Sequence, residues 1–72
     1  SPNTEAVMDA ILLAEGLYRF LRKERDSQVD YLSAGNAKSY EAYQCAVGKI
    51  RAFELTEGFI KKEFKQLDEE DE

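Results

Sequence analysis

Long stretches without helix-breaking residues constrain this chain more than any other feature. Proline occurs only at Pro2, and between Thr4 and Ser33 the single glycine is Gly16. Good helix formers fill this stretch, which predicts one helix over about residues 4–33. At 1.5 Å per residue such a helix is about 45 Å long. The residues that can cap its start are Ser1, Asn3 and Thr4.

Turn and capping residues then divide the chain in two. Gly35 can adopt the left-handed conformation that ends a helix, and Asn36 tolerates a turn. Ser39 supplies an N-cap for a second helix over about residues 40–67, with Glu41 in its first turn. Because so short a connection reverses the chain, we expect an all-α protein built as an antiparallel two-helix hairpin.

Apolar residues follow a heptad spacing in both predicted helices. The row in the first helix consists of Val7, Ile11, Ala14, Tyr18, Leu21 and Leu32. The row in the second helix consists of Tyr43, Ala46, Ile50, Phe53, Ile60, Phe64 and Leu67. Packing these rows together pairs Leu21 with Phe53 and gives the hairpin its internal contact.

Further apolar residues lie beside these two rows. Close packing needs facing ridges and grooves, so one antiparallel helix covers only one row well. Leaving the remaining apolar surface in water costs about 25 cal/mol per Å². We therefore expect self-association that completes a helical bundle, most simply a four-helix dimer, through an interface made of Leu13, Leu17, Phe20, Val47, Leu55 and Phe59.

Three positions in the second helix carry local predictions. Glu57 interrupts the heptad row and is expected to pair with Arg19 or Arg22 at its edge; alternatively, a buried polar residue fixes register or oligomeric state. Cys45 is expected to be a small buried hydrophobe. Gly48, four residues before an alanine, leaves a notch that another helix can approach closely.

Composition argues against several classes of function. The chain has no histidine and one cysteine, so we expect no catalytic residues, no cofactor and no metal site, and hence no enzyme. The net charge of −5 disfavours nucleic acid as a partner, and the longest apolar run, Ala10–Ala14, is too short to cross a membrane. The acidic residues 68–72 are expected to form a disordered tail after a single domain over residues 1–67.

Part of the sequence resembles a group of short helical-hairpin proteins of tailed bacteriophages, often encoded near head and packaging genes. Leu32–Gln44 contains a Gly-containing turn followed by a Ser/Tyr pair that opens a helix, and Val47–Glu54 contains a Gly-Lys-Ile-Arg segment. The resemblance extends from residue 29 to residue 59. It implies a viral origin and a helical hairpin, and it supplies no catalytic residues.

Together these features predict a non-enzymatic phage structural or assembly protein that acts through helix–helix contacts as a homo-oligomer, with another phage structural protein as a partner. The alternative is a small acidic phage protein that binds a host protein and inhibits or redirects it. One unpaired cysteine fits a reducing compartment, which here is the host cytoplasm, with the virion as a second location.

Overall fold

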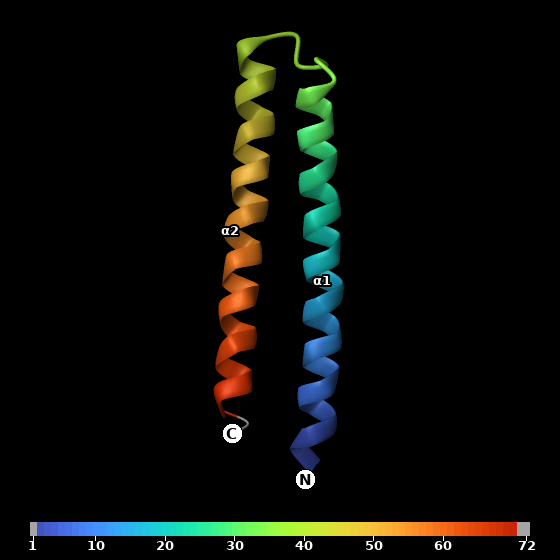
Figure 1. Cartoon of the computed structure of the whole chain (residues 1–72), viewed down its shortest axis with the longest axis vertical. Helices are drawn as coiled ribbons and strands as arrows, with labels where there is room; N and C mark the ends of the chain where they lie inside the picture. Colours follow the sequence, from blue (N-terminus) through green and yellow to red (C-terminus); the bar gives the residue numbers. More distant parts are fainter. Residues whose placement is uncertain (1, 71–72) are drawn as a thin grey trace.

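Two long antiparallel helices make up the whole fold (Figure 1). The computed structural model describes the backbone of residues 2–70 and the side chains of residues 4–66. Helix α1 spans Pro2–Ser33 and helix α2 spans Tyr40–Glu70. The prediction of an all-α antiparallel two-helix hairpin is confirmed.

Helix α1 ends in a Schellman motif at the predicted glycine. Gly35 has a φ of 74°, in the left-handed region. Its N–H donates to the carbonyl of Leu32 at 3.0 Å, and the N–H of Asn36 donates to the carbonyl of Tyr31 at 3.2 Å. These two bonds satisfy carbonyls that the end of a helix leaves without partners.

Helix α2 begins with the predicted serine cap. The N–H of Ala42 donates to Oγ of Ser39 at 3.0 Å, and Glu41 places its negative charge in the first turn. Lys38 Nζ also donates to the carbonyl of Gly35 at 3.2 Å, which adds a contact across the bend. The bend is therefore specified by hydrogen bonds among residues close in sequence.

The start of α1 differs from the prediction. The helix begins at Pro2, two residues earlier than expected, so Asn3 and Thr4 belong to the helix and do not cap it. Proline suits the first turn of a helix, because its missing N–H would lack a partner there and its φ already matches. The third candidate cap, Ser1, lies outside the described residues.

The end of α2 also differs. The helix continues to Glu70, so the prediction that it ends near residue 67 is wrong and the backbone of Asp68–Glu70 is helical. Glutamate is a good helix former, and each residue added to an existing helix gains a hydrogen bond without a new nucleation step. Residues 71–72 of the predicted tail lie outside the described residues.

The two helices face each other along one stripe each. Partly or fully buried positions in α1 are Val7, Ile11, Ala14, Tyr18, Leu21, Arg25, Gln28, Tyr31 and Leu32, among others. Those in α2 are Ala42, Ala46, Val47, Ile50, Phe53, Glu57, Ile60 and Phe64. The predicted heptad rows are thus largely on the inner face. Among the described members of these rows the exception is Tyr43, which is half exposed, while Ala42 turns inward in its place. The side chain of Leu67 lies outside the described residues.

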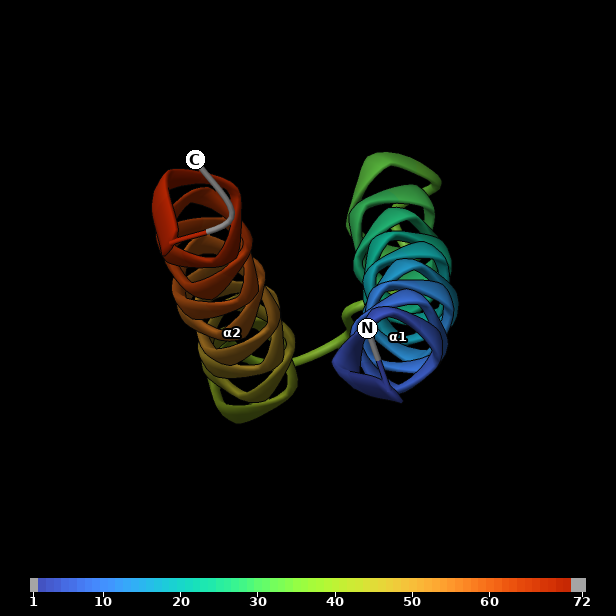
Figure 2. The ribbon, with the colours of Figure 1, turned by 90° about the horizontal axis from the view of Figure 1, so that it is seen from below.

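This arrangement leaves almost no core. Among the described side chains, only Ala46 and Glu57 are classed as buried. The molecule measures 55 × 15 × 14 Å, and its radius of gyration of 16.4 Å exceeds the value of about 11 Å for a compact domain of this length. Figure 2 shows the two helices end on, with no third element over their outer faces.

Two glycine substitutions should have opposite effects on stability. Gly35→Ala places a side chain at positive φ and should lower the free energy of unfolding by about 1 kcal/mol. Gly58→Ala is the matched control: it lies within α2, where an added Cβ meets nothing within 4 Å, and it should raise stability by about 0.5–1 kcal/mol. Urea unfolding followed by circular dichroism measures both values. Equal effects of the two substitutions would contradict the assigned bend.

Candidate functional site

An apolar row along one flank of α1 is the first candidate site. Leu13 is 67% exposed, Phe20 is 58% exposed and Leu17 is about half exposed. Ala10 precedes them at the same alternation of three and four residues and is exposed as well. We call these four residues the α1 row. The alternation places them on one side of the helix, next to the stripe that contacts α2.

A second apolar stripe lies on the side of α2 that turns away from α1. Leu55 is 76% exposed and Phe59 is 63% exposed. Gly48 and Ala52 precede them on the same helical face, and a Cβ built on Gly48 meets nothing within 4 Å. The predicted notch is therefore open, and α1 does not fill it. We call these four residues the α2 outer stripe.

The six predicted interface residues thus do not form one continuous surface. Leu13, Leu17 and Phe20 belong to α1, whereas Leu55 and Phe59 lie on the far side of α2. The sixth, Val47, is half-buried beside the contact between the helices. One partner helix cannot cover both exposed faces, because they lie on different helices and face different sides of the hairpin.

Other large exposed apolar side chains were not predicted to lie in the interface. They are Met8, Leu12, Val29, Tyr40 and Tyr43, of which Tyr43 was assigned to the inner heptad row. The four-residue spacing of Met8 and Leu12 is the signal that could have identified a further apolar edge of α1. Exposed apolar side chains are therefore distributed along both helices and are not confined to one patch.

An ion pair between a buried carboxylate and a partly buried arginine joins the two helices. Arg25 Nη1 donates to Oε2 of Glu57 at 3.1 Å, and Glu57 is only 7% exposed. The predicted partners Arg19 and Arg22 are wrong: both are exposed, whereas Arg25 lies on the inner stripe with Leu21 and Gln28. Of these three arginines, only Arg25 lies on the inner face of α1, from which it reaches the carboxylate on the inner face of α2.

The second carboxylate oxygen of Glu57 is buried without a partner. No hydrogen bond to Oε1 is present, although the atom is inaccessible to solvent. Arg25 also contacts Asp26 at 3.4 Å, so its guanidinium is shared between a buried and an exposed carboxylate. A polar pair of this kind contributes little net stability but disfavours registers that separate the two charges.

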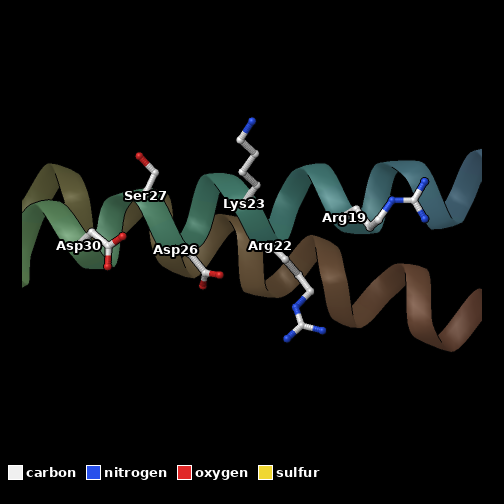
Figure 3. Close-up of a pocket in the computed structure, with 6 residues that line it drawn as sticks. All are labelled: Arg19, Arg22, Lys23, Asp26, Ser27 and Asp30. Carbon is white, nitrogen blue, oxygen red and sulfur yellow. The ribbon is translucent and has the colours of Figure 1, made fainter.

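The polar side chains that line a depression on α1 do not converge on a common centre (Figure 3). Figure 3 shows a shallow surface depression on α1 in which Arg22 and Lys23 point in opposite directions. Arg22 instead lies over the ring of Tyr18, 5.7 Å from its centroid. The described residues contain no group of three or more side chains placed to hold a metal ion.

The lone cysteine is not where the sequence predicted it. Cys45 is exposed, so the prediction of a buried small hydrophobe is wrong. Cys45 comes one residue before the buried Ala46, and a shift of one residue turns a helical side chain by about 100°. That rotation is enough to move the thiol from the inner stripe to the surface.

Comparisons with known proteins add no assignment. Searches against protein-family models, curated proteins and solved structures find no match for this chain. Within the described part of the chain, neither helix combines the length and the apolar character needed to cross a membrane.

Replacing one partner of the Arg25–Glu57 pair should lower the free energy of unfolding more than replacing both partners. Arg25→Met leaves Glu57 buried without its cation and should cost about 2–3 kcal/mol, whereas Arg25→Met with Glu57→Leu should return to within about 1 kcal/mol of the unmodified protein. Arg22→Met is the control and should cost less than about 1 kcal/mol, because it loses only an exposed contact with an aromatic ring.

Urea unfolding at one fixed protein concentration compares the three variants. If Arg22→Met proves as harmful as Arg25→Met, the assignment of the buried pair is wrong.

Proposed function

We propose that this protein works by helix–helix contact as a homo-oligomer, in a structural or assembly role, and not by catalysis. The observation that carries the proposal is the exposure of the α1 row on a hairpin that has almost no core of its own. Monomeric proteins rarely leave contiguous large apolar side chains in water, and such surfaces are typical of protein interfaces.

The amount of exposed surface supports this proposal. The chain exposes 5812 Å², about 1300 Å² more than a compact protein of 8.2 kDa, for which the expected value is about 4500 Å². A standard interface buries about 800 Å² on each partner. A second rod laid along this one would remove an area of about that size, so one standard contact accounts for more than half of the excess.

The resemblance to short hairpin proteins of tailed phages directs the assembly role toward the phage particle. In this proposal the partners are copies of the chain itself and a phage structural protein. The α2 outer stripe favours a second contact, because it remains open when the α1 row is covered. The alternative function, binding of a host protein, would use that stripe.

Two charges placed in the α1 row should disrupt the oligomer. Leu13→Glu with Leu17→Glu should reduce the solution mass to that of one chain, since it forces two carboxylates into an apolar contact without partners. The hairpin should persist, because both residues are exposed and neither belongs to the stripe that contacts α2. Light scattering on a size-exclusion column, together with circular dichroism, measures mass and helicity.

The matched control is Leu55→Glu with Phe59→Glu, which adds the same two charges to the α2 outer stripe and should leave the mass unchanged. Loss of mass in the control but not in the first variant would assign self-association to α2 and contradict the proposal as stated.

A further inference from the structure

The edge of the α1 row carries charges of opposite sign at its two ends. Asp9, Gly16 and Lys23 follow one another at intervals of seven residues and therefore share one side of the helix. Over residues 9–23 this edge is acidic, then uncharged, then basic, and the next residue of the series, Asp30, lies beyond the α1 row. Such a sequence of charges is complementary to itself only when one copy is reversed.

The two charged ends are free to engage another chain. The side chains of Asp9 and Lys23 are both exposed. Among the described residues, the ion pairs within the hairpin are those of Arg25 with Asp26 and with Glu57, so neither Asp9 nor Lys23 is paired.

The charge distribution over residues 4–25 of α1 has the same polarity, and the acidic residues Asp26 and Asp30 follow it near the end of the helix. Residues 4–15 contain three acidic and no basic side chains, whereas residues 19–25 contain four basic side chains and one acidic. Two parallel copies would set like charges against each other over both segments. Two antiparallel copies set the acidic segment of each against the basic segment of the other.

Side-chain sizes fit the same reversed alignment. When Leu13 of one copy faces Leu17 of a second, antiparallel copy, Ala10 faces Phe20, a small residue against a large one. This alignment is centred on residue 15, so Gly16 of each copy lies close to the centre and Asp9 of each copy is offset from Lys23 of the other by only about 3 Å along the helix. Alternation of small and large residues is how facing layers interdigitate without voids.

We propose that the partner of the α1 row is a second copy of this chain, bound antiparallel along α1 about a two-fold axis near Gly16, with the pair Asp9 to Lys23 formed twice. The inference rests on the proposed self-association and adds the partner's orientation. An isologous contact of this kind closes after two chains and does not extend into a filament.

Charge reversal tests the orientation. Asp9→Lys and Lys23→Glu should each weaken the dimer about tenfold, because each turns two attractive pairs into repulsive ones, and the double variant should restore the original dissociation constant. A parallel dimer would pair each residue with its own copy, so it would not be weakened by either single change. Sedimentation equilibrium at low ionic strength measures the constants, with circular dichroism to verify helicity.

Matched controls reverse two charges on the other helix, α2. Glu54→Lys and Arg51→Glu change the net charge by the same amounts and should leave the dissociation constant unchanged. Added salt should reduce the effect of the α1 reversals, since both pairs are exposed.

The outcomes separate the two proposals. If the unmodified protein stays monomeric, the proposed self-association fails and the orientation fails with it. If the protein associates but the single reversals have no effect, or the double variant is not restored, the antiparallel arrangement alone is overturned.

Discussion

Contact along a single stripe between two long helices is the interaction on which the rest of this structure depends. A helix in a protein gains most of its stability from packing of its apolar face, and here each helix packs against one other helix. Half of each helix must then remain in water. The elongated shape, the scarcity of buried side chains and the exposed apolar rows all follow from a described chain that consists of two helices and no third element.

The buried pair of Arg25 and Glu57 lies within this single stripe. An apolar stripe along two helices tolerates sliding by one turn, because similar side chains recur every three or four residues. A charged pair does not tolerate it, since a shift of one turn leaves a carboxylate on the inner face without its guanidinium. The pair therefore specifies register where apolar packing alone specifies it weakly, and the unpartnered oxygen of Glu57 is a cost of that arrangement.

Local features could be predicted from the sequence, whereas features that depend on register could not. Gly35 and Ser39 were identified correctly because their hydrogen bonds involve residues at most five positions away. The predicted partner of Glu57 was wrong because the true partner depends on how far α2 is offset along α1. Matching of charges does not determine that offset to within one helical turn. The predicted burial of Cys45 was wrong because the rotation between two consecutive helical residues separates the inner stripe from the surface.

The candidate surfaces show the same division. Five of the six predicted interface residues are large, exposed and apolar. Their division between the α1 row and the α2 outer stripe depends on which face of each helix packs inside the hairpin. Heptad spacing gives the position of a residue relative to its neighbours on one helix. It does not give the direction in which the second helix lies.

The central claim is that the hairpin is a subunit and not a finished domain. Sedimentation velocity of the unmodified protein over a wide range of concentration tests this claim most directly. We expect a mass of two 8.2 kDa chains or a small multiple at micromolar concentrations, with dissociation on dilution. A single 8.2 kDa species that remains fully helical at every concentration would contradict the claim, because the exposed apolar row of α1 would then be stable in water without a partner.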